Sequence, residues 1–221
     1  MAEVSQARRD RAPLSRGRIV GAALSLIDER GLDQLTMRRL GADLGVEAMS
    51  LYKHVAGKEA ILDGVRELLL QEFAATLALD EGGPGWRAQL ARFANAYRAL
   101  GLAHPEAFGL LAQDRERTYL AGREVAEAGL ERLIAGGLDH RRAVLAQRTV
   151  VRFVLGFGLI DPAAEQAPRV ASDEELAALR TEQPLVGELM RSLTAEQADQ
   201  ELFDFGLEAL LEGLDRIIAR G

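Results

Sequence analysis

The sequence of 221 residues (24.0 kDa) suits one small and one larger domain, and its 48% of hydrophobic residues suffices for a packed core. It contains no cysteine, which excludes disulfides, thiolate metal sites and cysteine nucleophiles. The basic, polar N-terminus lacks the apolar core of a signal peptide, and the longest apolar run, 153–160, is too short to span a bilayer. We therefore expect a cytoplasmic protein without a membrane partner.

The net charge of −7 argues at first against a nucleic-acid partner, but the charge is unevenly distributed. Residues 1–60 contain 10 Lys+Arg and 8 Asp+Glu, a balance of +2, whereas residues 61–221 contain 17 and 26, a balance of −9. A basic arm of this kind, residues 1–13, can lie along DNA phosphates, or it can be a solvated tail. The arginines before or at the start of the first predicted helix are Arg8, Arg9, Arg11, Arg16 and Arg18.

Residues 14–60 predict a small helical domain. Ser15 is a candidate N-cap for the first helix, which carries an apolar stripe at helical spacing and ends at Gly31. Thr36 caps a second helix, and Gly45 stands just past its last apolar position, where a left-handed residue is needed.

Residues 36–54 predict two short helices joined by a tight turn. Gly41 and Ala42 are small, so the second helix of the pair can cross the first at close range. This pattern is typical of a helix-turn-helix, whose second helix enters a DNA major groove. The apolar residues that share faces are Leu40 with Leu44 and Leu51 with Val55.

The other face of the second helix carries groups that suit DNA. Tyr52 and His54 can donate to phosphate oxygens, Lys53 can neutralise a phosphate or reach a base edge, and Met49 offers apolar contact to a thymine methyl. We expect phosphate contacts mainly from Tyr52, His54 and Lys58, and base contacts from Arg38 of the first helix and from Ala48, Met49 and Ser50. The predicted DNA-binding residues are Thr36, Arg38, Ala48, Met49, Ser50, Tyr52, Lys53, His54 and Lys58.

Everything after residue 57 is predicted to be helical, so the fold class is all-α. A long helix begins at Lys58, and the Gly- and Pro-rich stretch 81–85 breaks the chain without the spacing of a phosphate-binding loop. The stretch 161–172 contains two prolines and predicts a loop. The remaining predicted helices are 86–103, 105–113, 115–136, 140–160, 173–192 and 195–219.

The stretch from Leu14 to about Glu72, and LTMRRLGADLGVEAMSLYKHVAGKEAIL in particular, resembles the DNA-binding domain of the tetracycline-repressor (TetR) family. Later segments, at 86–98, 153–158 and 205–214, resemble the all-α C-terminal domain of tetracycline repressors. Relative to the family pattern, Lys53 replaces a common aromatic residue and Met49 replaces a common Pro. The operator sequence of other family members therefore cannot be assigned to this protein.

The resemblance implies a helix-turn-helix domain at 14–60 and a ligand-binding and dimerisation domain at 61–221. It further implies a homodimeric repressor that a small organic effector releases from a palindromic double-stranded DNA operator, although activation stays open. Helices 140–160 and 195–219 would form a four-helix bundle with a second subunit. Independently, 195–219 has an unusually wide apolar surface, which suits burial against both its own core and a partner; a fully internal terminal helix in a monomer is the alternative.

The effector site is expected among aromatic residues of the larger domain, although plain core packing is the more usual role for each of them taken alone. Gly156 and Gly158 can leave room for a ligand or allow close helix contact. The His that binds the magnesium–drug chelate in tetracycline repressors has no counterpart here, and Phe93 stands where their drug-binding Asn falls. We therefore predict an effector other than a tetracycline, and no metal or cofactor. The candidate residues are Trp86, Phe93, Tyr97, Phe108, Tyr119, Phe153 and Phe157.

Two other functions remain as alternatives. An all-α enzyme would need reactive groups, yet the sequence shows no paired-His site, no nucleophile elbow and no nucleotide loop. A helical scaffold or degenerate regulator that acts through protein contacts would keep the fold but would not need Lys53 and His54.

Overall fold

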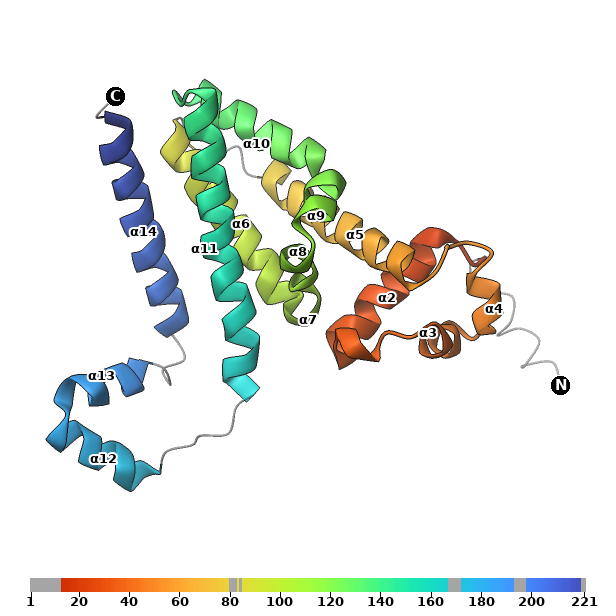
Figure 1. Cartoon of the computed structure of the whole chain (residues 1–221), viewed down its shortest axis with the longest axis horizontal. Helices are drawn as coiled ribbons and strands as arrows, with labels where there is room; N and C mark the ends of the chain where they lie inside the picture. The colour runs from red at the N-terminus through yellow and green to blue at the C-terminus, as the bar shows by residue number, and fades with distance from the viewer. Residues whose placement is uncertain (1–12, 80–82, 84, 167–171, 193–197, 220–221) are drawn as a thin grey trace. The chain divides into compact units, whose positions relative to one another are not determined.

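The computed structural model of the protein describes residues 13–79, 83, 85–166, 172–192 and 198–219, and every regular element in these ranges is a helix (Figure 1). The predicted all-α class is confirmed. The described residues form two compact units. Unit 1 extends to Ala74 and includes Glu106–Arg123, and unit 2 contains Ala75–Pro105 and the residues from Glu124 onward. The predicted boundary between the DNA-binding and the ligand-binding domain, between residues 60 and 61, differs from the boundary of these compact units and stays a prediction.

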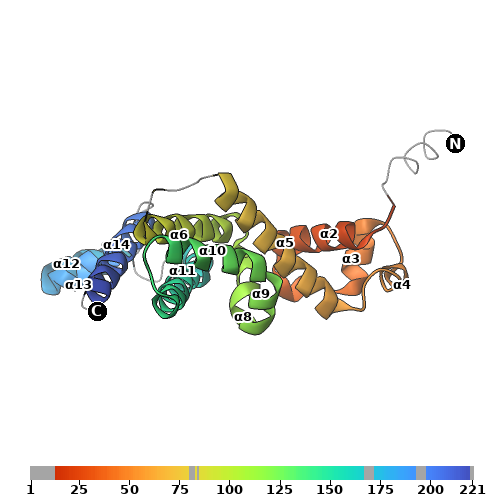
Figure 2. The same ribbon diagram turned by 90° about the horizontal axis from the view of Figure 1, so that it is seen from above.

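Unit 1 packs the N-terminal helices around the first part of a long helix, α5 (Figures 1 and 2). Its core contains fully buried side chains from five of these elements: Ile19, Ile27, Leu40, Leu51, Ile61, Leu69 and Phe108. The elements are α2 (Arg16–Arg30), the short 3-10 helix η1 (Leu32–Gln34), α3 (Met37–Leu44), α4 (Ala48–Leu51), α5 (Lys58–Leu79), α7 (Pro105–Phe108), α8 (Leu110–Gln113) and α9 (Arg115–Ala121).

The helix ends of unit 1 lie where the sequence predicted them. The Ser15 hydroxyl accepts a hydrogen bond from the Arg18 N–H at 3.3 Å, and the Thr36 hydroxyl accepts one from the Arg39 N–H at 3.2 Å. Each bond satisfies an N-terminal amide that has no partner within its helix. Gly45 ends α3 in the left-handed region, with φ at 68°, which glycine adopts at little cost. These three assignments are confirmed.

The close crossing of α3 and α4 depends on Gly41 alone. A Cβ atom placed on Gly41 would lie 3.0 Å from the carbonyl oxygen of Val46 and 3.2 Å from the amide nitrogen of Ala48. Both are backbone atoms of the turn and of α4. Ala42, which the sequence also predicted at the crossing, is exposed, so that part of the prediction is wrong.

Unit 2 is built around α6 (Trp86–Ala103), against which α11 (His140–Gln166) and α14 (Ala198–Ala219) both pack. Helix α11 also packs against α14, and α12 (Asp173–Glu182) pairs with α13 (Pro184–Ser192). The remaining helix is α10 (Arg123–Ala135). The core is lined by small and branched side chains with two aromatics: Leu90, Ala94, Tyr97, Val150, Val154, Phe203, Leu207 and Leu211.

An ion-pair cluster joins α6 to α14 within unit 2. The Arg87 guanidinium contacts the carboxylates of both Glu208 and Asp215. Its hydrogen bond with Asp215 raises the pKa of Arg87 above its ordinary value. Since all three side chains are at least partly exposed, water and salt screen much of this attraction.

Several predicted boundaries are corrected. The predicted loop 161–172 is wrong over 161–166, because α11 continues to Gln166. Pro162 lacks only its own N–H, and residues 163–166 are favourable helix formers, so the helix persists beyond it. Residues 167–171 lie outside the described residues, as do 195–197 of the predicted last helix.

Three other predicted helices are each divided in two. The predicted 173–192 is interrupted at Gln183, whose backbone is displaced from helical values because Pro184 follows it. The predicted 115–136 is interrupted at Gly122, and the predicted 105–113 at Gly109. The predicted 86–103 is confirmed as α6.

We predict opposite effects for two Gly→Ala substitutions. Gly21→Ala, in the middle of α2 with no atom within 4 Å of the new Cβ, should raise the free energy of unfolding by up to about 1 kcal/mol through helix propensity. Gly41→Ala should lower it by about 1–3 kcal/mol, because the methyl group meets backbone that cannot rotate away. Thermal unfolding followed by circular dichroism measures both. Equal stability of the two variants would contradict the close crossing.

Candidate nucleic-acid interface and effector site

Helix α4 is held by the core beneath it. Leu51 is fully buried and Val55 nearly so. The turn before α4 is closed by a hydrogen bond of 2.8 Å from the Val46 N–H to the Gly41 carbonyl oxygen. After Leu51 the chain continues through hydrogen-bonded turns, in which the His54 N–H donates to the Leu51 carbonyl at 2.9 Å. Residues 48–54 therefore form one continuous, anchored convex segment.

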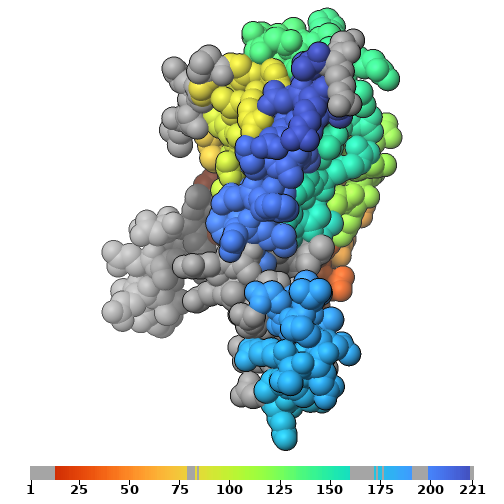
Figure 3. Space-filling view, turned by 90° about the vertical axis from the view of Figure 1, so that its left-hand side faces the viewer, coloured from red at the N-terminus to blue at the C-terminus, as the bar shows by residue number. Residues whose placement is uncertain are grey.

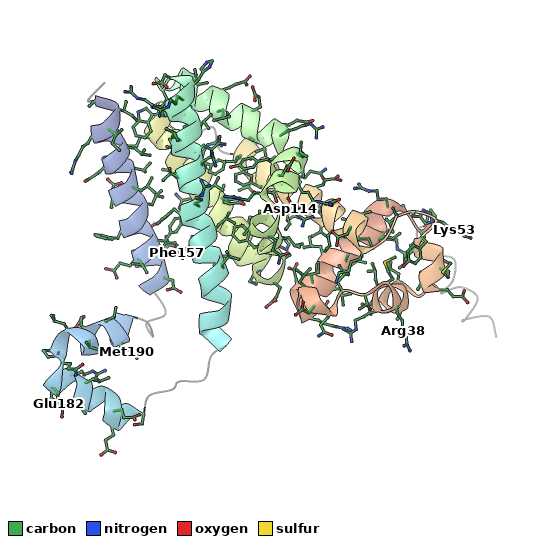
Figure 4. All side chains as sticks on the ribbon, in the orientation of Figure 1. Arg38, Lys53, Asp114, Phe157, Glu182 and Met190 are labelled. Atoms are coloured by element: carbon green, nitrogen blue, oxygen red, sulfur yellow. The ribbon has the colours of Figure 1, made fainter. Side chains whose placement is uncertain are left out.

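The outer side of this segment carries the predicted contact residues. Met49 is 71% exposed, an unusual position for a large apolar side chain without a partner. Tyr52, Lys53 and His54 are also exposed, and Lys53 extends from the turn after α4 in Figure 4. The structure thus brings these four groups together on one surface. Ala48 and Ser50 are half-buried at its edge.

Two neighbouring arginines of α3 have different environments. Arg38 is exposed and extends away from the helix (Figure 4). Arg39 is half-buried and donates to the backbone carbonyl of Gln34 at 3.2 Å and to the Gln34 side-chain oxygen. Arg38 is thus available to a ligand, whereas Arg39 stabilises the chain before α3. Thr36 is exposed as well as being the cap of α3, and Lys58 is exposed at the start of α5.

The basic arm can be examined only in part. Arg16 lies in the first turn of α2 and forms an ion pair of 2.8 Å with Glu67 on α5. This contact ties α2 to α5, a structural role that the sequence did not indicate. Arg8, Arg9 and Arg11 lie outside the described residues, so the predicted DNA contact of residues 1–13 stays a prediction.

A charge cluster of one buried and two partly exposed side chains joins α5 to the later segment of unit 1. The Asp63 carboxylate accepts hydrogen bonds of 2.8 Å from Arg66 and 2.8 Å from Arg117 on α9. Arg66 is buried, and its Nε donates to the Leu110 carbonyl oxygen at 3.4 Å. The hydrogen bond to Asp63 raises the pKa of Arg117 above its ordinary value. Residues 106–123 are therefore bound by charge as well as by packing to the helix that follows α4.

The seven predicted effector residues are divided between the two units. Phe108 is fully buried in unit 1, and Tyr119 on α9 is exposed. In unit 2, Phe93 and Tyr97 are adjacent with ring centroids 5.9 Å apart, and Phe153 and Phe157 meet edge to face at 5.0 Å. Trp86, the first residue of α6, is half-buried.

Gly156 is exposed, and a Cβ placed there would meet no atom within 4 Å, so it makes no close helix contact inside the chain.

Sequence reasoning missed three buried residues of unit 2. Phe203 on α14 is fully buried, and its ring centroid lies 5.3 Å from those of both Phe153 and Phe157. Arg98 and Gln147 are buried polar side chains of α6 and α11. Phe203 was predicted as part of the wide apolar surface of 195–219, and no local signal distinguishes an inward from an outward position there. Arg98 follows Tyr97 directly, but an arginine in a helical pattern ordinarily indicates a solvated face.

Among the described residues, no three His, Asp or Glu side chains are grouped so as to hold a metal ion. His104 is the C-cap of α6 and His140 is the first residue of α11. In the same ranges, no helix is both long and apolar enough to cross a membrane.

The arrangement of a helix-turn-helix head and a larger helical unit agrees with comparisons to known families. Residues 19–65 match the model of bacterial regulatory proteins of the tetR family, and residues 79–218 match that of the tetracyclin repressor-like C-terminal domain. The chain belongs to the TetR family. Its members are DNA-binding transcriptional regulators with a ligand-binding domain.

Individual relatives are similar over nearly the whole chain. The class G tetracycline repressor of Vibrio anguillarum is 31% identical over 206 residues, which cover 93% of this chain and 96% of that protein. The HTH-type transcriptional repressor DrrR1 of Streptomyces coeruleorubidus is 29% identical over 221 residues, covering 94% and 79%. The Streptomyces coelicolor TetR family protein ActR, solved in complex with actinorhodin, is 30% identical with a TM-score of 0.72, covering 92% and 97%.

We predict that substitutions of Thr36 separate its capping role from a phosphate contact. Thr36→Val should lower the free energy of unfolding by about 1 kcal/mol, because the Arg39 N–H loses its acceptor. Thr36→Asp keeps an acceptor and should keep the stability, but its negative charge should weaken binding to a DNA duplex. Circular dichroism and fluorescence anisotropy measure the two effects. If Thr36→Asp left duplex binding unchanged, Thr36 would not lie near a phosphate.

Proposed function

We propose that this TetR family member is a homodimeric repressor that binds a palindromic DNA operator and leaves it when a small organic effector binds. The observation that carries the DNA assignment is the exposed outer side of residues 48–54. The inner side of the same segment is anchored by Leu51 and Val55, so the position of the outer groups is fixed by the core. A convex, anchored segment with exposed donors suits a major groove.

Each predicted contact has a role in this proposal. Tyr52, His54 and Lys58 bind phosphates, and their contacts set the register of the head on the duplex. Arg38, Ala48, Met49 and Ser50 approach base edges, with Lys53 able to serve either purpose. The Thr36 hydroxyl oxygen accepts the capping hydrogen bond of α3, and its hydroxyl hydrogen donates to a phosphate. Arg39, held by Gln34, positions the start of α3 rather than contacting DNA.

The dimer is supported by the two faces of α14. Phe203, Leu207 and Leu211 are buried inside unit 2, whereas Leu202, Phe205 and Ile217 are exposed on the other side of the helix. Phe205 is 73% exposed, which is unfavourable for so large a ring in water. In Figure 3 the surface of α14 faces the viewer beside α11 with no described helix over it. Helix α11 adds exposed Val144 and Leu145.

A second copy would therefore bury these outer faces in a four-helix bundle. The twofold axis would place two recognition segments about 34–36 Å apart, one turn of the duplex.

The effector acts in this proposal through α5. This helix starts directly after the DNA-reading segment, and Asp63 binds it to Arg117 in the segment 106–123. An effector that binds more tightly when this segment is displaced would move α5 and the head with it. We propose that the protein is not an enzyme, that it acts in the cytoplasm, and that its effector needs no metal and is not a tetracycline.

We predict that Lys53→Ala combined with His54→Ala abolishes sequence-specific duplex binding. Both side chains are exposed, so the substitutions should leave helicity and dimerisation intact. Fluorescence anisotropy on an operator selected from random DNA measures binding at several salt concentrations. The wild type should show a steep salt dependence, because each phosphate contact releases counterions.

A matched control removes an equal number of exposed cationic or titratable groups from unit 2, as Arg132→Ala with His140→Ala. This variant should bind the operator like the wild type. Unchanged binding by the Lys53/His54 variant would show that the recognition segment is elsewhere, and would favour the scaffold alternative.

We predict that Phe205→Glu separates the subunits. The substitution places a charge in the centre of the proposed interface, where it would be desolvated without a partner. Sedimentation velocity should show a monomer, and affinity for the palindrome should fall by at least about tenfold because only one head then binds. Leu120→Glu, an exposed apolar position of α9, is the control and should remain dimeric. A dimeric Phe205→Glu variant would exclude this face of α14.

A further inference from the structure

Arg98 is a buried cation for which the described part of the chain provides no anion. Its side chain lies in unit 2 and is only 8% exposed. Its Nη1 donates to the backbone carbonyl oxygen of Asp199 at 3.2 Å, and its Nε is buried without any hydrogen-bond partner. Among the described residues, no carboxylate oxygen comes within 4.0 Å of this guanidinium.

The other buried arginine shows what a compensated site looks like in this chain. Arg66 is 4% exposed, forms an ion pair of 2.8 Å with Asp63, and donates its Nε to a backbone carbonyl. A guanidinium stays protonated inside proteins, so its burial is costly unless an anion or a full set of acceptors accompanies it. Arg66 meets this requirement and Arg98 does not.

Aromatic rings surround the uncompensated guanidinium. The Arg98 Cζ atom lies 4.3 Å from the centroid of the Phe203 ring and 5.8 Å from that of Phe157. Stacking on these rings offsets part of the cost of burial. The rings do not provide acceptors for Nε, however, so its hydrogen-bonding capacity remains unused.

The cluster is closed on one side and partly open on the other. Phe203 is fully buried, whereas Phe153 and Phe157 of α11 are half-buried. Figure 4 places Phe157 at the side of α11 that faces α14. A small molecule that entered beside Phe157 would reach an aromatic surface first and a fixed cation behind it.

We propose that Arg98 binds the carboxylate of an aromatic effector, whose ring packs against Phe157 and Phe203. The edge of a guanidinium that carries Nε binds a carboxylate through two parallel hydrogen bonds. This inference rests on the proposed effector function and specifies its chemistry as an aromatic organic acid. It adds a charged group to the aromatic residues among which the effector site is expected.

A carboxylate from a second copy is the competing occupant, and the structure favours the small molecule. Arg98 contacts Phe203, which belongs to the inner side of α14. The exposed residues available to a second copy, Leu202 and Phe205, lie on the outer side. A carboxylate that packed against this outer side would be separated from the guanidinium by α14.

The test uses the full-length protein without DNA and two pairs of probes: benzoate with benzamide, and 2-naphthoate with 2-naphthamide. Isothermal titration calorimetry should show at least one acid binding about tenfold or more tightly than its amide, because only the acid forms charge-assisted bonds with Arg98. Arg98→Met should reduce this preference to about one. Arg98→Lys keeps the charge but lacks the paired N–H donors of the guanidinium, so it should give an intermediate preference for the acid over the amide. This variant replaces Arg98→Met in the test if the Met variant does not fold.

Arg132→Met, an exposed arginine of α10, is the matched control and should keep the full preference. Equal binding of acids and amides by the wild type, or a preference that survives in Arg98→Met, would overturn the proposal. The thermal midpoint of ligand-free Arg98→Met should equal or exceed that of the wild type, since an uncompensated charge is removed. A lower midpoint together with an unchanged preference would show a structural role instead.

Sedimentation velocity distinguishes the second copy. If Arg98→Met became monomeric while it kept the acid preference, the guanidinium would serve the dimer and the proposal would fail. Binding of a selected operator is measured separately. Failure of the wild type to bind any operator would count against the repressor function, whereas the calorimetric ratios would still decide the role of Arg98.

Discussion

The packing of Leu51 and Val55 into the core of unit 1 is the contact on which the proposed DNA-reading surface depends. A helix of four residues is too short to persist in water by its own hydrogen bonds. Helix α4 exists because its inner side chains are buried and because Gly41 lets the turn approach α3 closely. The packing of Leu51, Val55 and Gly41 therefore offsets the conformational entropy that is lost when Met49, Tyr52, Lys53 and His54 are ordered. The proposed DNA contacts do not include these three residues.

The two units use charge in different ways. In unit 1, Asp63 compensates Arg66 and Arg117 and so joins segments that are far apart in the sequence. In unit 2, Arg87 joins α6 to α14 at the surface, while Arg98 lies among aromatic rings with its charge uncompensated by the described residues. The first two arrangements stabilise the folded chain without help. The third leaves a buried nitrogen of the guanidinium without a hydrogen-bond partner, and the proposed anion would compensate this charge.

The parts of the structure that sequence reasoning anticipated are those fixed by local chemistry. Ser15, Thr36 and Gly45 act within one turn of their own position, so residue type and spacing sufficed to place the caps. The chain at 161–166 is helical although the two prolines of 161–172 predict a loop, because the residues that follow Pro162 favour a helix. The aromatic cluster was beyond reach, because the convergence of α6, α11 and α14 on Phe203 is set by tertiary packing that no local pattern encodes.

The division of residues 48–54 into an anchored side and a free side bears on how the protein can change. Met49, Tyr52 and Lys53 contribute almost nothing to the core, so replacing them alters the free energy of folding very little. Replacing Leu51, Val55 or Gly41, in contrast, would alter the free energy of folding strongly, because these residues pack in the core or at the close crossing. If the exposed side chains read DNA as proposed, a lineage, or a designer, can exchange them to read a different DNA sequence while the scaffold, the proposed dimer face and unit 2 remain as they are.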